Sequence, residues 1–186
     1  RSSDIWFRPA QFCNGPDGNL YITDMYREVI EHPARLPPII KQHLDLNSGN
    51  DRGRIYRIAP ADHARRKQLD MGALTSEELA RQLDHPNAWH SETAARLLCE
   101  RNDVSVAPAL RELARRSNYP IGRIRARYVL DHLGLLDIET VAHALRDPDE
   151  AARAHAVRLA ESRPEALNEA ADSLAHDPSA MVRLQT

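Results

Sequence analysis

The sequence predicts an α+β protein by segment, with antiparallel strands and a long loop over residues 1–60 and helices alone over residues 61–186. Two observations predict this division. Turn-rich, strand-like runs end at the stretch Gly53–Pro60, and beyond it Leu and Ala recur at helical spacing. Only 5% of residues are aromatic, which favours helices packed through small and aliphatic side chains over an all-β core.

Three strands are expected in residues 1–60. The first is the run Arg8–Cys13, followed by the turn Gly15-Pro16-Asp17-Gly18, where Pro presets φ and Gly closes the turn. Leu20–Asp24 is rich in β-branched and aromatic residues and is typical of a strand. Arg54–Ile58 is the expected closing strand.

Arg57 is expected on the same strand face as Ile55, where its charge requires a partner, and Asp24 is the expected one. Asp17 belongs to the turn, since it lacks the spaced carboxylates of a calcium loop. Three or four strands bury too little apolar area to fold alone. Earlier strands or the following helices must therefore cover them.

The long loop between Asp24 and Arg54 holds the candidate site. His32 with Asp24 is the candidate catalytic pair, because a general base is usually a His oriented by a carboxylate. The candidate ligand-binding residues are Arg27, Glu31, Asp51 and Arg52. The alternative is structural: Glu31-His32-Pro33 fixes the loop and Asp51 pairs with Arg52.

Several motifs follow one another in residues 1–60: Phe7-Arg8-Pro9, Gly15-Pro16-Asp17-Gly18-x-Leu20-Tyr21, Asp24-Met25-Tyr26, Ile30-Glu31-His32-Pro33 and Gly49–Ile58. Together they resemble the end of the membrane-bound dehydrogenase β-propeller of large secreted planctomycete and verrucomicrobial proteins. That domain is similar to quinoprotein glucose and sorbosone dehydrogenases. The resemblance implies a partial propeller blade, with the upstream blades as partners.

The same resemblance implies a periplasmic or extracellular location. It also implies a parent protein that oxidises a sugar or alcohol with pyrroloquinoline quinone and passes electrons to a c-type haem domain. Neither cofactor is expected within residues 1–186, and no catalytic residue is carried over by motif. The chain opens on Arg1, so we expect a fragment of a larger protein.

Residues 61–186 contain repeats. Turns marked by Pro86, Pro120, Pro148 and Pro178 recur at a spacing of roughly 30 residues, within the range of helical-hairpin repeats. Each unit predicts two helices with Pro at the start of the second. Thr75-Ser76-Glu77-Glu78 has capping-box spacing and predicts the start of the first helix.

An Arg stands at the fifth position after each of the last three prolines, at Arg125, Arg153 and Arg183, whereas Ser91 stands there after Pro86. Asp-Pro turns followed by Arg resemble HEAT repeats. The resemblance implies a right-handed all-α solenoid of about 3.5 repeats. Such a solenoid offers a concave surface to a downstream domain or protein partner.

Arg115, Arg116, Arg123 and Arg127 form a candidate interaction surface in the second repeat. The alternative is a repeat-to-repeat ladder in which arginines pair with Asp147 and Asp177.

Composition and spacing limit the function classes. The formal net charge of −2 gives no case for nucleic-acid binding. No apolar run reaches the ~20 residues of a membrane span. The nine His residues show no recurring metal-ligand spacing, and Cys13 and Cys99 form no CxxC motif. The family resemblance implies part of an oxidoreductase, and the alternative is a non-catalytic scaffold for protein binding.

Overall fold

The computed structural model describes residues 2–62, 68–168 and 170–186, and divides the chain into two compact units, Arg1–Gln68 and Leu69–Thr186. The boundary expected from the sequence was Pro60. The first unit holds a three-stranded sheet and the second holds helices, so the two kinds of secondary structure are separated as expected.

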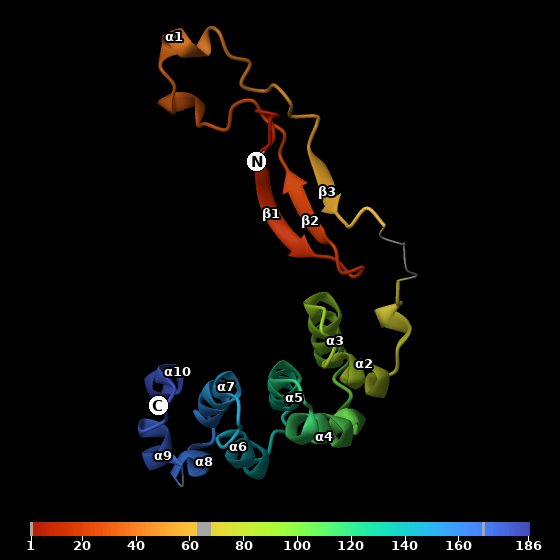
Figure 1. The fold of residues 1–186 in the computed structure, drawn as a ribbon, viewed down its shortest axis with the longest axis vertical. Helices are drawn as coiled ribbons and strands as arrows, with labels where there is room; N and C mark the ends of the chain where they lie inside the picture. Colours follow the sequence, from red (N-terminus) through yellow and green to blue (C-terminus); the bar gives the residue numbers. More distant parts are fainter. Residues whose placement is uncertain (1, 63–67, 169) are drawn as a thin grey trace. The chain divides into compact units, whose positions relative to one another are not determined.

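The sheet of the first unit is antiparallel, with β2 (Leu20–Asp24) between β1 (Pro9–Asn14) and β3 (Arg54–Ile58) (Figure 1). β2 and β3 have the predicted bounds, and β1 is shifted by one residue. Ile22 lies opposite Phe12 on β1 and Tyr56 on β3, so these three side chains share one face. A register shift follows Pro9, which cannot donate to the ladder.

The loop between β2 and β3 carries only short helices, η1 (Pro33–Arg35) and α1 (Pro38–Lys41). Two backbone positions fix its path. Tyr26 has a φ of 47°, and Asp24 Oδ1 accepts a hydrogen bond from the Tyr26 N–H at 2.9 Å. Gly49 has a φ of 82°, and a Cβ there would collide with the Tyr26 carbonyl oxygen. The loop therefore closes tightly beside the end of β2.

The second unit begins with η2 (Met71–Ala73) and continues as helical hairpins. The first three pairs are α2 (Ser76–Gln82) with α3 (Ala88–Arg101), α4 (Ala107–Arg116) with α5 (Pro120–His132), and α6 (Ile138–Ala144) with α7 (Glu150–Ala160). The 3-10 turn η3 (Val104–Val106) precedes α4, and α8 (Pro164–Asn168), α9 (Ala171–Ala175) and α10 (Ala180–Gln185) complete the unit. Within this unit α3, α5, α7 and α10 lie in one layer and the other helices in a second (Figure 1).

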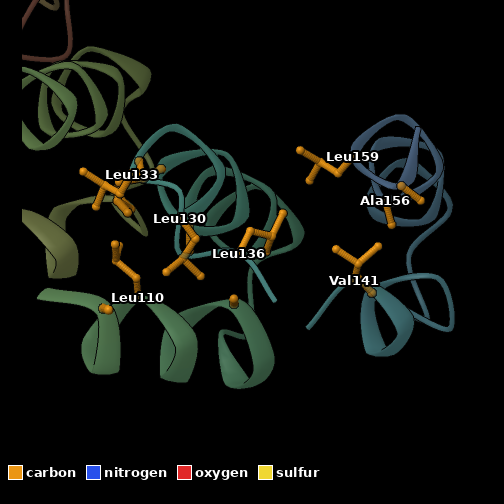
Figure 2. Close-up of a cluster of buried hydrophobic side chains, with 14 of the residues drawn as sticks. Leu110, Leu130, Leu133, Leu136, Val141, Ala156 and Leu159 are labelled. Atoms are coloured by element: carbon orange, nitrogen blue, oxygen red, sulfur yellow. The ribbon is translucent and has the colours of Figure 1, made fainter. Parts of the chain in front are cut away.

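The core of the second unit lies between its two layers of helices. Leu110 of α4 faces Leu130 and Leu133 of α5, and Val141 of α6 faces Ala156 and Leu159 of α7 (Figure 2). Ile121 and Ile138 are exposed at the first turns of α5 and α6. At a helix start the chain enters from the turn, so the apolar neighbours that cover later positions are missing.

The helix starts follow local capping rules. The side chain of Thr75 accepts a hydrogen bond from the Glu78 N–H, and Glu78 accepts one from the Thr75 N–H, so the predicted capping box is present. Pro120 begins α5 as expected. The prediction was wrong for Pro86, Pro148 and Pro178, which lie two residues before their helices. There Asn87, Asp149 and Ser179 are the N-cap residues.

Candidate functional site

Asp24 and His32, the expected catalytic pair, have different roles in the structure. Asp24 is buried, and its Oδ1 accepts hydrogen bonds from the backbone N–H groups of Arg8 (2.8 Å) and Tyr26 (2.9 Å). His32 is exposed, and its Nδ1 accepts a hydrogen bond from the Ala34 N–H at 3.2 Å, which caps η1. Asp24 therefore holds the backbone at Arg8 and Tyr26, and His32 holds the backbone of its own turn.

A hollow of about 550 Å³ brings together three of the expected site residues, Arg27, Glu31 and His32. Arg27 donates from Nη2 to the Leu46 carbonyl at 2.7 Å, which ties the two sides of the loop together. The Nε of Arg27 is buried and bonds to no atom in the part of the chain that the structure describes. Arg27 thus lines the hollow with its cationic side chain, while its Nε is enclosed by protein.

Arg35 is a lining residue that the sequence reasoning missed. It follows His32 by three residues, and in the 3-10 turn η1 residues three apart lie on the same side. His32-Pro33-Ala34-Arg35 therefore carried a local signal for it. The hollow is lined by two arginines, Arg27 and Arg35, and by one carboxylate, Glu31. The net charge of these lining residues is therefore positive at neutral pH.

Asp24, Asp51 and Arg52 do not line this hollow. Asp51 and Arg52 are both exposed, with Arg52 Nε 3.7 Å from Asp51 Oδ1. A pair this exposed contributes little to stability. The expected ligand-binding set is therefore divided, with Arg27 and Glu31 at the hollow and Asp51 and Arg52 outside it.

The expected pairing of Arg57 with Asp24 is wrong. Arg57 Nη1 lies 3.2 Å from Asp17 Oδ2, and the Tyr21 hydroxyl donates to the same oxygen at 3.0 Å. Asp24 faces Arg54 in the strand register and so lies on the opposite face of the sheet from Arg57. Hydrogen bonds from Asn19, with further bonds from Tyr21 and Arg57, lower the pKa of Asp17 to about 2.

The basic cluster of the second repeat is divided between surface and core. Arg115 and Arg116 are exposed and form ion pairs with Glu139 (2.8 Å) and Glu112 (3.1 Å). Arg123 and Arg127 are buried, so their assignment to an interaction surface was wrong. The exposed arginines have nearby carboxylates, so this surface does not present a strong positive charge.

Arg123 and Arg127 form a buried ion cluster with Asp147. Arg123 binds both oxygens of Asp147, with Nη2 at 2.6 Å and Nε at 2.8 Å, and Arg127 Nη2 lies 2.8 Å from Oδ2. Burial alone would raise the pKa of Asp147, but the hydrogen bonds from Arg123 and Arg127 outweigh it and hold the pKa at about 2. This cluster is the ladder expected as the alternative, and Arg153 forms the corresponding pair with Asp177.

Arg125 was expected to correspond to Arg153, but the structure places Arg123 in that position. Arg123 and Arg153 each bind an aspartate 24 residues ahead, whereas Arg125 lies 3.5 Å from Glu92 of α3. The reason is the place of the proline, because Pro120 is itself the first residue of α5, whereas Pro148 lies two residues before α7. Counting from the proline therefore shifts the comparison by two positions.

Two searches over the described residues were negative. The structure there holds no group of three or more His, Cys, Asp or Glu side chains able to bind a metal ion. None of the helices described is long and apolar enough to cross a membrane.

Known proteins give one similarity. Residues 1–62 match the model of DUF7133, a domain family of unknown function. No curated protein and no solved structure matches the chain. The match covers the three strands, the loop and the hollow.

Proposed function

We propose that this chain is a joining and scaffold segment of a secreted protein. In this proposal the first unit is the last blade of a β-propeller, and the second is a HEAT-like right-handed solenoid that offers a surface to a partner. The upstream blades are then the partners of the sheet. The location is periplasmic or extracellular, as the family resemblance implies.

The observation that carries the proposal is the exposure of the sheet. Every residue of β1 and β3 is exposed, including Phe12 (57%) and Ile55 (69%). β1 and β3 are also edge strands in the described sheet, so each presents unpaired N–H and C=O groups. Three strands with uncovered apolar side chains are not stable in water by themselves. Neighbouring blades would cover the faces of such a sheet.

Hydrogen exchange tests this proposal. The chain is compared with a version extended upstream along its gene, and amide exchange is followed in β1 and β3. We expect amides of Phe12 and Ile55 to exchange at least tenfold more slowly in the extended protein, because neighbouring blades exclude water from the sheet. Equal exchange rates in both proteins would count against the blade assignment.

A second candidate function is supported by the hollow in the loop. The side chains of Arg27, Arg35 and His32, which line the hollow, favour an anionic ligand. These donors fit the carboxylates of pyrroloquinoline quinone, which supplies redox chemistry in the dehydrogenases that residues 1–60 resemble. Arg27 and Arg35 would bind carboxylates, and His32 would accept a proton from a substrate hydroxyl. The chain contains no CxxCH motif for haem attachment.

Calorimetric titration of the extended protein with pyrroloquinoline quinone tests this candidate. We expect Arg27→Gln to weaken binding about tenfold or more, because it removes a half-buried positive charge from the lining of the hollow. Arg52→Gln is the matched control, since Arg52 is exposed and lies outside the hollow. Absence of binding, or equal effects of the two substitutions, would exclude the hollow as the quinone site. An oxidation assay with a sugar panel and His32→Ala then tests catalysis separately.

A further inference from the structure

Three arginines of the second unit, Arg123, Arg153 and Arg183, occupy equivalent positions in successive repeats. Each donates from Nη1 to the carbonyl oxygen of the residue six positions earlier. The bonds are Arg123 to Ser117 (2.7 Å), Arg153 to Asp147 (2.9 Å) and Arg183 to Asp177 (2.6 Å). The shared bond holds the three guanidinium groups to their own turns in the same way.

The first two arginines use the other edge of the guanidinium to bind the next hairpin. Nε and Nη2 of Arg123 bind Asp147 at 2.8 and 2.6 Å, and those of Arg153 bind Asp177 at 2.7 and 2.9 Å. Each aspartate lies in the turn of the following hairpin, 24 residues ahead of its arginine. This bidentate pair is a strong link between neighbouring hairpins.

Arg183 makes the bond from Nη1 to the carbonyl of its own turn, but it makes no bond from Nε and Nη2 to an aspartate in the described residues. Its Nη1 also reaches the Pro178 carbonyl at 3.1 Å, as Arg153 Nη1 reaches that of Pro148 at 3.2 Å. Within residues 2–62, 68–168 and 170–186, no carboxylate bonds to the Nε–Nη2 edge of Arg183. Arg183 is exposed, whereas Arg123 is buried. A donor fork therefore faces solvent at the position where the earlier two bind aspartate.

The first hairpin has no arginine at this position, and the turn of the hairpin that follows it has no aspartate. His85 occupies the turn position there, because its Nδ1 accepts from the Asn87 N–H (3.0 Å) as Asp147 Oδ1 accepts from the Asp149 N–H (3.1 Å). At the sixth position after His85 the chain has Ser91 in place of Arg.

The turn residue of the second hairpin is correspondingly Ser117, which donates from Oγ to Asp84 at 2.6 Å. Arginine and aspartate are thus absent together at this junction. A buried arginine without a carboxylate is costly, which explains their joint absence. Arg183 is exposed here, and a hairpin that covered it would have to supply a carboxylate for the same reason.

Leu184 gives an independent indication at the same place. It is 84% exposed, whereas Ala154 and Ile124, which stand at the equivalent positions of the two preceding repeats, are each 6% exposed. Those two positions are buried in the stacked part of the unit. The exposed surface around Arg183 and Leu184 of α10, here called the α10 end face, thus combines an apolar side chain with an unused donor fork.

We propose that the α10 end face binds a further helical hairpin whose turn carries an aspartate, in the arrangement that joins the second, third and fourth hairpins. A second copy of this chain does not fit, because its first hairpin would present His85 in place of the aspartate. The proposal deepens the scaffold role proposed above and rests on it. Its test concerns only the helices, so failure of the blade or quinone proposals would not affect the result.

The test extends residues 1–186 by a second copy of residues 157–186, which adds one full repeat. The copy of Asp177 then follows Arg183 at the same separation along the chain as Asp177 follows Arg153. Thermal unfolding is measured for four extended proteins. The copied aspartate is either kept or replaced by asparagine, and each of these two proteins is made both with Arg183 and with Arg183→Gln. Hydrogen exchange of Val182 and Leu184 in α10 is followed in the same four proteins.

In the protein with Arg183, we expect the asparagine replacement to lower the melting temperature by about 4–8 °C. In the protein with Arg183→Gln, the same replacement should lower it by less than about 2 °C, because the pair is already broken. Arg158→Gln is the matched control, because Arg158 is exposed on α7 and has no carboxylate partner in the described chain. That substitution should leave the effect of the asparagine replacement intact. Equal shifts with and without Arg183, or an extension that adds no helical signal and no protection in α10, would overturn the proposal.

Discussion

The helical unit contains a buried cluster of charged residues beside its apolar core. Arg127 is among the largest fully buried side chains, with 1% exposure, and Asp147 joins it to Arg123. Two nitrogens of Arg127, Nε and Nη1, are buried without a hydrogen-bond partner in the described chain. The cluster therefore depends on Asp147 to balance two buried cations.

Asp147→Asn should destabilise the helical unit by about 3–5 kcal/mol at pH 7, because it leaves Arg123 and Arg127 without their counter-charge. Urea unfolding followed by circular dichroism measures this. Glu139→Gln is the control, since it removes an exposed partner of Arg115, and it should cost less than about 1 kcal/mol. A loss for Asp147→Asn no larger than that of the control would contradict the assigned role.

The same carboxyl makes stability depend on pH. The folded pKa of Asp147 is about 2 and its ordinary value is 3.8, so the folded state favours the ionised form. Its contribution is present above about pH 4 and is lost as pH falls toward 2. The stability difference between the native chain and Asp147→Asn should therefore shrink as the pH is lowered from 7 through this range. A difference that stays constant would contradict the depressed pKa.

Individual helices are defined by short-range signals, and α2 is the clearest case. The Thr75 hydroxyl and the Glu78 carboxylate satisfy each other's backbone N–H groups. Two side chains of α2, Leu79 and Leu83 at its C-cap, are completely buried, so the cap positions a helix that contributes to the core. The cap and the apolar face thus support the same helix.

Thr75→Ala should lower the free energy of unfolding by about 1 kcal/mol, because the Glu78 N–H loses its acceptor. Thermal unfolding of the two proteins measures this loss. Thr75→Ser keeps the hydroxyl and is the matched control, expected within about 0.5 kcal/mol of the native chain. If the two substitutions had equal effects, the hydroxyl would not be the stabilising group.

At the scale of the whole molecule, the two units differ in how much of their apolar surface is covered. The buried apolar cluster runs from Met71 to Val182 and lies entirely within the second unit. In the first unit only Ile22 is a buried apolar side chain among the described residues. The helical unit therefore has a core of its own, and the sheet does not.

A chain of residues 68–186 should fold without the first unit. We expect its helical circular dichroism signal to persist and its melting temperature to stay within about 3 °C of that of the longer chain, because no core residue is removed. Differential scanning calorimetry provides the comparison. Loss of the cooperative transition would show that the helices depend on residues 1–67.

The local elements were determined by the sequence. Alternation and turn residues located β2 and β3 at their observed bounds, and the capping box located α2, because these signals act between residues a few positions apart. The same holds for the recurrence of the turns between helices, which local proline signals mark. The part of the site that the sequence predicted is Arg27, Glu31 and His32, which lie close together in one loop.

The pairings between distant residues were decided only by the tertiary structure. Arg57 binds Asp17 and not Asp24, because strand register places Asp24 on the other face of the sheet. Arg123, not Arg125, enters the ladder, because Arg123 lies four residues after the N-cap of its helix, as Arg153 does, whereas the proline used for counting stands two positions later in its turn. Register and helix phase depend on how whole elements pack, so no local pattern specifies which charged groups meet.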